Sequence, residues 1–583
     1  MSKAVLRFTF SPVQPFIAEA RRTADLFAGS RILAELAAAA AQSIVDNGGS
    51  LVFPSSLSGR RHDAPNVVVA LVPWERAEEI AQSAEHALNR RWQALVGEAR
   101  QTLSGLAPVD QLWDETWQRQ TAQLWDVYWS AARLDGSYGQ AFRRASQGLA
   151  ATKRLRAFAQ VEEPGLKDSL SGNRAALRTR ALDAPAYWKR VRRAHPALGA
   201  VGEHERLDAV GAVKRFARLA QEETFPSLPT VAARPFLERA EARAKTELAA
   251  YAGALEKLFR SAGLEPQRLR RRTSESFSYD GGFLFLNRLE REALAEELGL
   301  DQWPEQAEPA RVAAVERLRV LYGATGWRGG PSPYVAVVVL DGDSMGRRID
   351  EELERSDSAE VHREFSRKLA DFADKVRELA RERSGVELVY NGGDDVLALA
   401  PVSEALDYAR AAAKAFHEIT GGSASAGIAI THWLQPLGDA LKAARRAEER
   451  AKQAKDKAAV CLELRRRSGE VTSVRARWEQ LDDLAIDQLV ELFRSGRLSG
   501  RLPHALRESA RIFAGTGPDF EAVVKRVVAR QGDWPEGTGP ERDAVVGRLV
   551  AFARALQVAR LGGTEELTGW LVVARFLAGG GEE

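Results

Sequence analysis

Cysteine and methionine are nearly missing from this chain of 583 residues, which has one cysteine, Cys461, and two methionines. A single cysteine excludes an internal disulfide, a CxxC redox pair and a zinc site built on cysteines. Long hydrophobic runs are also missing, because no stretch approaches the roughly 18 uncharged apolar residues that a membrane span needs. The first ten residues lack a signal-peptide pattern. We therefore expect a soluble protein of the reducing cytoplasm.

An excess of charge of one sign is missing too. Lys and Arg number 83 against 80 Asp and Glu, a formal charge of +3. Any contact with nucleic acid must then come from local basic patches, such as residues 189–193 and 268–272, although a solvated helix face is the commoner reason for such runs. The chain has 45% hydrophobic and 28% charged residues, which suits globular domains, and its length predicts about three to five of them.

The first part of the chain predicts an α+β domain followed by helices. Residues 4–10 alternate like a short strand, and strand-like runs follow at 51–53 and 67–72 after a helical stretch. From residue 74 to about 220 the pattern is mainly helical, and helical periodicity continues to the Gly/Pro-rich stretch 323–333, which is the best linker in the chain.

After this linker comes the clearest strand signal, YVAVVVL at residues 334–340. A continuous run of β-branched residues is typical of a strand buried on both faces, and this one ends in Asp-Gly-Asp. Strands and helices then alternate as β-α-β-β-α-β, the ferredoxin-like order. The expected elements are a helix at 358–383, strands at 386–390 and 396–400, a helix at 402–420, a strand at 423–431, a helix at 437–457 and a last strand at 458–464. From about residue 475 the tail reads as a helical bundle.

Acidic residues gather at one edge of this predicted sheet. The turn Asn391-Gly392-Gly393 predicts a hairpin with Asp394 and Asp395 at its mouth. In a split βαβ fold the first strand neighbours this hairpin, so Asp341 should lie close by, with Asp343 as a further carboxylate. Such crowded negative charges call for a cation, and oxygen ligands favour Mg²⁺ or Mn²⁺. Two such ions about 4 Å apart are the usual device for phosphoryl or nucleotidyl transfer.

Strand alternation orders these candidates. Asp394 and Asp395 cannot both face a metal unless the hairpin bends, so Asp394 is favoured and Asp395 is second. Asp341 and Asp343 are two residues apart and could share a face.

Residues beyond the first strand predict a nucleotide site. The backbone N–H groups after Asp343 open a short helix that can cradle a triphosphate. Lysines on the helix before the last strand could add a cation, although a solvated helix face is nearly as good an explanation. The nucleotide-contacting candidates are Gly342, Asp343, Ser344, Met345, Gly346, Gly392, Gly393, Lys452 and Lys455.

Gly-Gly-Asp-Asp alone is more often a hairpin with a solvated acidic tip. The combination with a fully apolar strand ending in Asp-Gly-Asp, in the full ferredoxin-like order, favours the metal site.

These motifs resemble a known family, the large subunit of type III CRISPR effector complexes in its Cmr-type form, whose paired Palm domains are related to nucleotide cyclases. SPVQPFIAEARRTADLFAGSRILAEL at 11–36 is similar to its opening Palm motif, and LDGDSMG at 340–346 with NGGDD at 391–395 is similar to its catalytic Palm. Weaker support comes from residues 426–431 and 451–470.

The resemblance implies an α+β multidomain fold with two ferredoxin-like Palm domains plus helical domains. We expect a first Palm domain without catalytic acids at 1–160, a helical domain with a degenerate zinc module at 161–330, the catalytic Palm domain at 331–470 and a C-terminal helical bundle at 471–583.

The resemblance also implies an activity: antiviral, RNA-guided synthesis of cyclic oligoadenylate from ATP by 3′-5′ nucleotidyl transfer, triggered by target RNA. Asp341, Asp394 and Asp395 carry over as catalytic and metal-binding residues. The implied partners are guide CRISPR RNA, target RNA and the other subunits of the complex, with no membrane.

Two departures from the family matter. Many members begin with an HD nuclease domain, but here the first Palm strand starts within ten residues of Met1, so we expect no DNA cleavage. His62-Asp63 lies in a loop with no partner histidines and is a poor metal candidate. Around Asp168 and Asp208 the spacing resembles two CxxC pairs without their cysteines, so we expect no zinc and a module held by apolar contacts instead.

Three alternatives stay open. The chain could be a catalytically silent scaffold, against which the retention of all three aspartates counts. It could be a free-standing cyclase that uses GTP, although the motif continues with Asp395-Val396 rather than Glu-Phe. It could also join AMP to another small acceptor.

Overall fold

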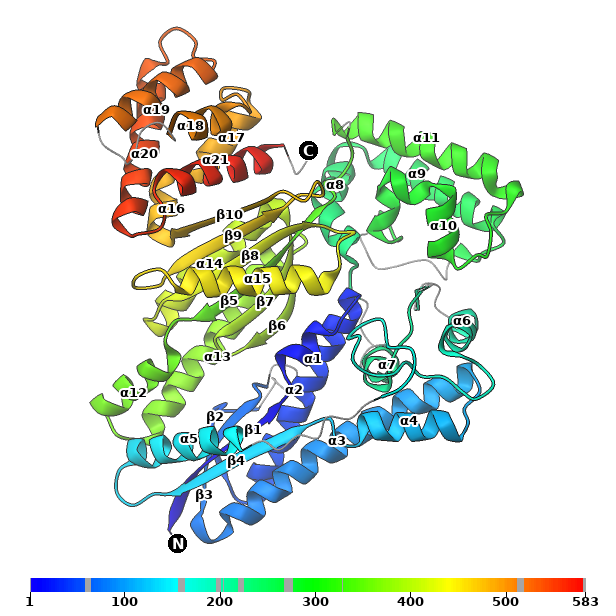
Figure 1. The fold of residues 1–583 in the computed structure, drawn as a ribbon, viewed down its shortest axis with the longest axis vertical. Helices are drawn as coiled ribbons and strands as arrows, with labels where there is room; N and C mark the ends of the chain where they lie inside the picture. The colour runs from blue at the N-terminus through cyan, green and yellow to red at the C-terminus, as the bar shows by residue number, and fades with distance from the viewer. Residues whose placement is uncertain are drawn as a thin grey trace.

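The computed structural model describes residues 2–57, 64–155, 163–195, 201–202, 204–218, 225–266, 276–327, 329–510 and 518–579. The basic run 268–272 and the dipeptide His62-Asp63 lie outside these residues. Two β-sheets and two groups of helices make up the fold, as Figure 1 shows.

The first sheet has four antiparallel strands in the order β2-β3-β1-β4. Its strands are β1 (Lys3–Ser11), β2 (Ser50–Phe53), β3 (Val67–Pro73) and β4 (Asp126–Arg133). Alternate residues of β1 face opposite ways, so Leu6 and Phe8 join the large core under the helices while Val5 joins a smaller core on the other face. The helices of this region are α1 (Gln14–Ala18), α2 (Thr23–Asp46), α3 (Ala77–Leu106), α4 (Gln111–Thr121) and α5 (Tyr138–Arg154).

The second sheet has six strands in the order β10-β9-β8-β5-β7-β6. Its strands are β5 (Tyr334–Gly342), β6 (Glu387–Gly392), β7 (Asp395–Pro401), β8 (Ala424–His432), β9 (Ala459–Arg465) and β10 (Val471–Arg477). Strands β8 and β9 are parallel and the other neighbours are antiparallel. The helices between these strands are α12 (Met345–Arg355), α13 (Ala359–Glu382), α14 (Val402–Thr420) and α15 (Leu437–Lys452).

Both sheets contain the ferredoxin-like order, as β4-β1-β3-β2 and β8-β5-β7-β6, which confirms the predicted fold class. The apolar run at β5 is buried on both faces as expected. Val335, Val337 and Val339 belong to the core shared with the first sheet and the middle helices. Ala336 and Val338 belong to the core shared with α13, α14 and the C-terminal helices. The central strand therefore joins the two largest cores of the molecule.

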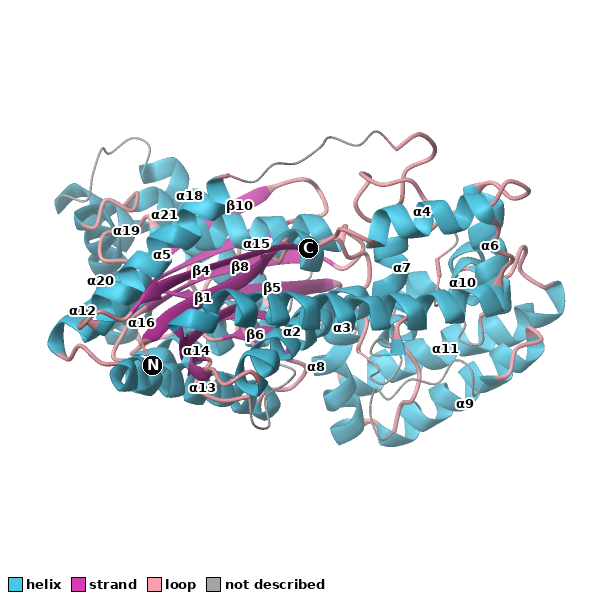
Figure 2. Ribbon diagram, turned by 90° about the horizontal axis from the view of Figure 1, so that it is seen from below, coloured by secondary structure: helices cyan, strands magenta, loops and turns pink. Residues whose placement is uncertain are grey.

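Two groups of helices complete the molecule. Figure 2 shows the strands gathered in one half, with α4, α6, α7, α9, α10 and α11 in the other. The middle group is α6 (Ala184–Ala194), α7 (Ala209–Phe216), α8 (Leu228–Arg243), α9 (Lys245–Ser261), α10 (Arg291–Leu298) and α11 (Glu308–Thr325). The C-terminal group is α16 (Trp478–Leu484), α17 (Ile486–Arg494), α18 (Leu502–Ala510), α19 (Pro518–Gln531), α20 (Gly539–Val558) and α21 (Thr564–Ala578). None of the described helices is long and apolar enough to cross a membrane.

Two strands correct the expectation from sequence. The stretch expected to be mainly helical contains β4, which pairs with β1 along its whole length. The strand at 459–465 is not the last, because β10 pairs with it in a hairpin and α16 follows only after Arg477. Both missed strands lie at the edge of their sheet, where a weaker apolar pattern suffices because one side has no strand partner.

The predicted zinc-free module is not held by apolar contacts alone, which corrects that expectation. Asp168 accepts hydrogen bonds from the backbone N–H groups of Leu170 (2.8 Å) and Ser171 (2.7 Å). Asp208 caps α7 and forms an ion pair with Arg174. Because a buried carboxylate is costly without a partner, these aspartates are satisfied by a guanidinium and by backbone donors.

Candidate active site at the end of strand β5

The end of β5 meets the β6–β7 hairpin at one edge of the second sheet. Strand pairing runs to Leu340 opposite Val396, and the backbone N–H of Gly342 then donates to the carbonyl of Asp394 (3.2 Å). Gly392 pairs with Asp395 across the turn, and Gly393 has φ +84°, a conformation that favours glycine. This contact places Asp341 beside the hairpin, as the sequence pattern predicted.

Two glycines let the backbone approach closely here. A Cβ on Gly392 would lie 1.8 Å from the hydroxyl of Tyr390, whose ring packs over the turn. The hairpin is anchored from the other side by Asn391, whose buried amide donates to the carbonyl of Ala373 in α13 (2.7 Å). The turn is therefore held in one position relative to β5.

The three aspartates influence one another electrostatically. Burial, followed by the negative charge of Asp341, raises the pKa of Asp394 to about 7. The same two causes raise the pKa of Asp395 to about 7. The negative charge of Asp341 therefore acts on both hairpin carboxylates, although strand alternation favoured only Asp394 as a metal ligand. Asp394 lies in the turn and only Asp395 belongs to β7, so strand alternation does not separate the two.

Asp343 has a different environment from the other three. Its carboxylate is buried and accepts hydrogen bonds from Ser423 (2.8 Å), Ser425 (2.9 Å) and the backbone N–H of Ala458 (3.0 Å). Three donors to one carboxylate fix the loop after β5 to the start of β8 and β9. Asp343 thus organises the site rather than adding a fourth free carboxylate.

A helix, α12, begins at Met345, where the sequence analysis expects a short helix after Asp343. Ser344 precedes the helix with φ +57°, a left-handed conformation that costs about 1 kcal/mol or more for a residue other than glycine. The first backbone N–H groups of the helix, at Met345 and Gly346, have no partners within the helix. The ammonium of Lys457 donates to the hydroxyl of Ser344 (3.0 Å). A positive charge and helix N–H groups therefore converge on this loop.

The two lysines chosen from sequence have different positions. Lys452 is the last residue of α15, and its ammonium contacts Asp341 Oδ2 and lies 2.5 Å from Glu448 Oε1. Lys455 lies beyond the end of α15 and is exposed, so the expectation that the helix carries it is wrong. Lys457 takes the position beside Ser344, and the three successive left-handed residues 456–458 turn the chain to bring it there.

Glu448 is an acidic neighbour that the sequence analysis missed. It reaches the site because α15 packs directly on Gly427 of β8, where a Cβ would lie 2.1 Å from the carbonyl oxygen of Ala444 and 2.2 Å from the nitrogen of Glu448. Its charge contributes to the raised pKa of Asp395. A glycine in an apolar strand, facing a helix with a glutamate, is a signal that could have found it.

The donors of this corner fit a hard divalent cation in chemistry, because they are carboxylate oxygens. They also fit in charge, since a cation would offset the repulsion that raises the pKa of Asp394 and Asp395. Their spacing does not form a metal site, because no group of three or more His, Cys, Asp or Glu side chains within the described residues could hold a metal ion. Asp341 is instead ion-paired with Lys452.

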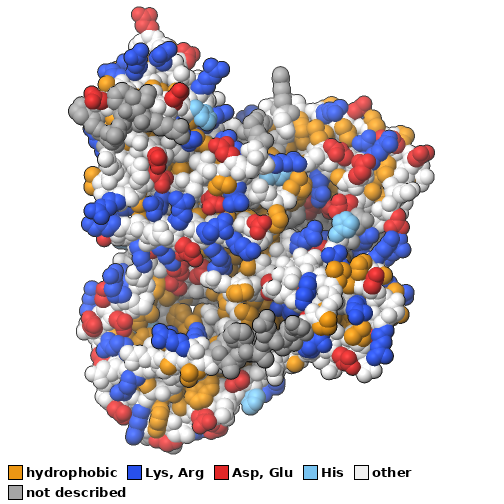
Figure 3. Space-filling model, in the orientation of Figure 1, with side chains coloured by type: hydrophobic (Ala, Val, Ile, Leu, Met, Phe, Trp, Pro, Cys, Tyr) orange, Lys and Arg blue, Asp and Glu red, His pale blue; other side chains and the backbone are white. Residues whose placement is uncertain are grey.

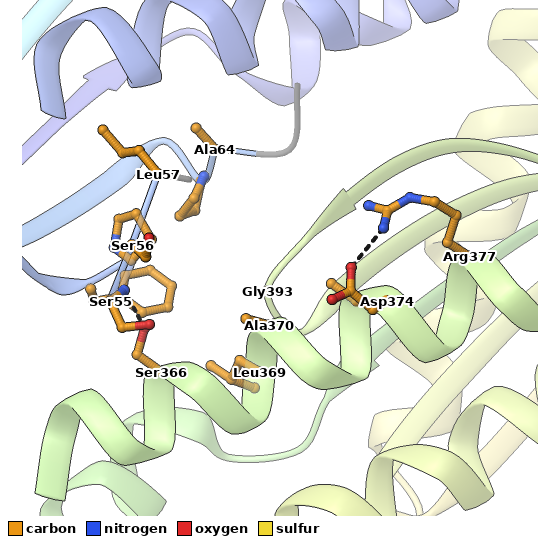
Figure 4. Close-up of a pocket in the computed structure, with 14 residues that line it drawn as sticks. Ser55, Ser56, Leu57, Ala64, Ser366, Leu369, Ala370, Asp374, Arg377 and Gly393 are labelled. Carbon is orange, nitrogen blue, oxygen red and sulfur yellow. Dashed lines mark hydrogen bonds and ion pairs between the residues drawn. The ribbon is translucent and has the colours of Figure 1, made fainter. Parts of the chain in front are cut away.

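A small pocket of about 40 Å³ lies beside the hairpin (Figure 4). Its walls come from β2 and the residues after it, from α13 and from Gly393. Phe53 and Leu369 supply apolar surface, and the backbone N–H of Ser55 donates to the hydroxyl of Ser366 (2.8 Å). Asp374 and Arg377 form an ion pair at one side (2.8 Å). Sequence reasoning could not find this pocket, because its two walls are separated by about 300 residues.

The face seen in Figure 3 is hollowed between the two sheets, with acidic side chains at the rim and basic ones above them. Acidic and basic groups therefore adjoin at the edge of this hollow.

Two family models match the chain. Residues 334–461 match the second palm domain of Cas10/Cmr2, and residues 5–97 match the N-terminal domain of the CRISPR-associated protein Cmr2. A curated relative, the CRISPR system Cmr subunit Cmr2 of Pyrococcus furiosus, is 30% identical over 238 residues, which is 36% of this chain and 25% of the relative. The chain therefore aligns with only a quarter of the length of that relative.

Two solved structures share the fold over most of the chain. The type III-B Cmr-beta complex in its apo state has a chain with TM-score 0.62 and 13% identity, covering 93% of this chain and 78% of that one. The same complex bound to cognate target RNA has a chain with TM-score 0.62 and 13% identity, and the match covers 91% of this chain and 78% of that one. The chain is thus similar to Cas10/Cmr2 proteins in the two matched regions, and the solved structures share its fold.

Proposed function

We propose, from this similarity, that the chain is the large subunit of a type III-B CRISPR effector complex in the cytoplasm and synthesises cyclic oligoadenylate from ATP when the complex binds target RNA. The 3′-oxygen of one adenosine attacks the α-phosphorus of another nucleotide, a phosphodiester forms, pyrophosphate leaves and the hydroxyl proton passes to water. The partners would be guide CRISPR RNA, target RNA and the neighbouring subunits.

One observation carries this proposal. Asp341, Asp394 and Asp395 gather where β5 meets the hairpin, and two of them have a pKa raised to about 7 by burial and by the charge of the third. Unfavourable charge of this kind is characteristic of sites that bind a cationic ligand. The aspartates lie next to the N-terminus of α12 and to Lys457, and both groups are suited to binding phosphates.

The chain's own residues would divide the work as follows. Asp341, Asp394 and Asp395 would hold Mg²⁺ or Mn²⁺, which when bound stabilises the charge that develops on phosphate oxygens. The N–H groups of Met345 and Gly346 would orient the triphosphate together with Lys452 and Lys457. Gly342, Gly392 and Gly393 would allow the nucleotide to approach the backbone. Together these residues would put the α-phosphate and the attacking hydroxyl in line.

The pocket beside Gly393 would receive the adenine base. Apolar walls of Phe53 and Leu369 suit the faces of a purine, and the Ser55–Ser366 pair offers polar atoms at its edge. Because β2 belongs to the first sheet and α13 to the second, both halves of the molecule would contribute to one nucleotide site (Figure 4).

The test is to assemble the complex with guide and target RNA, add ATP with Mg²⁺ or Mn²⁺, and identify the products by mass spectrometry. Wild type should give cyclic oligoadenylate, and a chain with Asp394→Ala and Asp395→Ala should give none. Arg446→Gln, an exposed change on α15 outside the site, is the matched control. Product that persists in the aspartate variant would refute the site, and linear AMP conjugates in wild type would favour another acceptor.

The scaffold alternative is favoured by one observation, the ion pair between Asp341 and Lys452. It predicts normal assembly and RNA binding in the aspartate variant with no nucleotide product from either chain. Gel filtration of both complexes, run beside the product assay, separates the two functions.

A further inference from the structure

The C-terminal helices form a pocket that takes no part in the proposed function. Its volume is about 180 Å³, which is room for about six water molecules at about 30 Å³ each. Its described lining residues all belong to α16 and α20, and none of them belongs to the strand end that carries the candidate active site. A space of this size suits a single heterocyclic base better than a whole nucleotide.

Polar side chains line both walls of this pocket. Asp483 lies near the end of α16, and Arg548 lies in the middle of α20. Gln480 also lines the pocket and is only 7% exposed. Its amide nitrogen donates to the carbonyl of Ala555 (3.2 Å), and its oxygen accepts from the backbone N–H of Arg477 (3.0 Å). The wall formed by α16 is therefore fixed relative to α20.

The two charged residues of the pocket are not paired. Arg548 and Asp483 form no ion pair with each other or with any other residue that the structure describes. The acid beside them in sequence differs, since Asp482 forms an ion pair with Arg410 (3.2 Å). The Nε of Arg548 is moreover buried and has no hydrogen-bond partner among the described residues. Because a buried donor without a partner is costly, this guanidinium calls for an acceptor that the described residues do not supply.

The rest of the lining is small or apolar. Gly547, Ala551 and Ala555 are spaced four residues apart and so lie on one face of α20. A Cβ on Gly547 would meet no described atom within 4 Å, so the space beside this face is open. Phe552 adds apolar surface. An apolar face with a few polar groups at its edges is the usual make-up of a site for a flat ring.

We propose that this pocket binds a guanine base, with Asp483 accepting from N1–H and the N2 amino group and Arg548 donating to O6 and N7. Guanine offers two donors to a carboxylate and two acceptors to a guanidinium at the same time, and the guanidinium contact to O6 and N7 is the commonest specific contact to this base. Adenine offers one amino group and one acceptor at the corresponding edge, and the pyrimidines lack N7. Two sources share this chemistry, a free guanine nucleotide and an unstacked guanine of an RNA strand.

Calorimetry on the full chain with guanosine monophosphate tests the pocket. Wild type should bind it at least about tenfold more tightly than adenosine monophosphate, because adenine loses one bidentate contact. Arg548→Gln and Asp483→Asn should each weaken binding about tenfold for the same reason. Asp482→Asn and Arg554→Gln are the matched controls, since both side chains form ion pairs outside the pocket, and each should change the affinity by no more than about twofold.

Base analogues assign each contact to its residue. 7-Deazaguanosine monophosphate lacks N7, so it should bind wild type several-fold more weakly than guanosine monophosphate does, whereas Arg548→Gln should bind the two alike. Inosine monophosphate lacks the N2 amino group and should show the same pattern with Asp483→Asn. Ala551→Leu fills the pocket and leaves both charges in place, so it should abolish binding. This variant also covers the chance that the loss of a charge prevents folding.

An oligouridylate with one central guanine separates the two sources. Binding of this RNA that is tighter than that of guanosine monophosphate, and that is lost in Arg548→Gln, would assign the pocket to RNA. Equal or weaker binding of the RNA would assign it to a free nucleotide.

Four results would overturn the proposal and leave the proposed active site untouched. They are no binding of either probe, equal affinity for adenosine monophosphate, unchanged affinity in Ala551→Leu, and analogue losses that persist in the matching variant. Displacement of guanosine monophosphate by an excess of ATP would also overturn it, because the base would then be bound at the candidate active site.

Discussion

The two sheets share one strand order and differ at one strand end. In the first sheet, pairing of β1 with β3 ends at Thr9 opposite Val67, and in the second, pairing of β5 with β7 ends at Leu340 opposite Val396. The next residue is Phe10 in the first sheet and Asp341 in the second. Phe10 is buried against Trp125 with ring centroids 5.6 Å apart, whereas Asp341 remains partly exposed and ion-paired.

The connections after these strand ends differ as well. The β6–β7 turn is tight and brings two aspartates to the strand end, while the β2–β3 connection is long and sends Phe53 and Ser55 across to the hairpin of the other sheet. The same strand order thus serves two different purposes. The second sheet carries the three aspartates, and the first sheet lines one side of the pocket beside Gly393.

The largest expected effect comes from removing the charges that only the second sheet has. Asp394→Asn with Asp395→Asn should lower the rate of nucleotide product formation by about a thousandfold or more, since a cation would lose most of its ligands. The same change should stabilise the free fold by about 1–2 kcal/mol, because it relieves buried repulsion. Product assays measure the expected loss of activity, and urea unfolding measures the expected gain in stability.

The matched change in the first sheet is Thr9→Val, which keeps the shape of a buried residue outside the site. It should leave product formation within about twofold of wild type. A large loss of activity in this variant would show that the two strand ends are functionally alike.

A glycine in each half should respond to alanine in opposite directions. Gly427→Ala places a Cβ against the backbone of α15, which cannot move away easily, so unfolding should become easier by about 2–4 kcal/mol. Gly97→Ala lies in the interior of α3 with no atom within 4 Å of the new Cβ, and it should stabilise the protein by about 1 kcal/mol. Thermal unfolding of both variants measures the contrast.

The contact between the two halves should weaken in acid. The hydroxyl of Tyr138 in α5 is hydrogen-bonded to Nδ1 of His362 in α13 (2.9 Å), and burial lowers the pKa of His362 to about 4. Between its ordinary pKa of 6.5 and about 4, the unfolded chain binds a proton that the folded chain does not. The contribution of His362 to the free energy of unfolding is therefore fully present above pH 6.5. It falls as the pH drops toward 4, by about 3 kcal/mol over the whole range.

Unfolding by urea between pH 4 and 7 measures this loss. A variant with His362→Phe and Tyr138→Phe removes both polar groups together and should show a flatter pH dependence. An unchanged slope would assign the acid sensitivity to other groups.

The smallest expected effect concerns the shared pocket. Ala370→Phe should fill part of it and raise the KM for ATP about tenfold, because the base loses its space, while Mn²⁺ binding stays unchanged. Ala151→Phe, on the exposed side of α5, is the control with the same added side chain. Equal effects of the two variants on KM would exclude the pocket as the base site.

Much of the second sheet could be predicted from local pattern. The β-branched run of β5 and the glycine turn before Asp394 carry their own signals, since burial on both faces and positive φ are properties of short segments. Strand β4 was missed because its signal is weak and lies between helices. The sequence pattern selects Lys455 and overlooks Lys457, because which of them lies beside Ser344 depends on where α15 ends.

By itself, the sequence determined the order β8-β5-β7-β6 within the second sheet and the presence of its three aspartates, because side-chain alternation and turn preferences act over a few residues. Only the tertiary structure decided that Lys452 contacts Asp341, 111 residues away, and that Ser55 meets Ser366 across the two sheets. Such contacts depend on how closely helices and sheets pack, which is settled by the combined shape of many side chains rather than by any single segment.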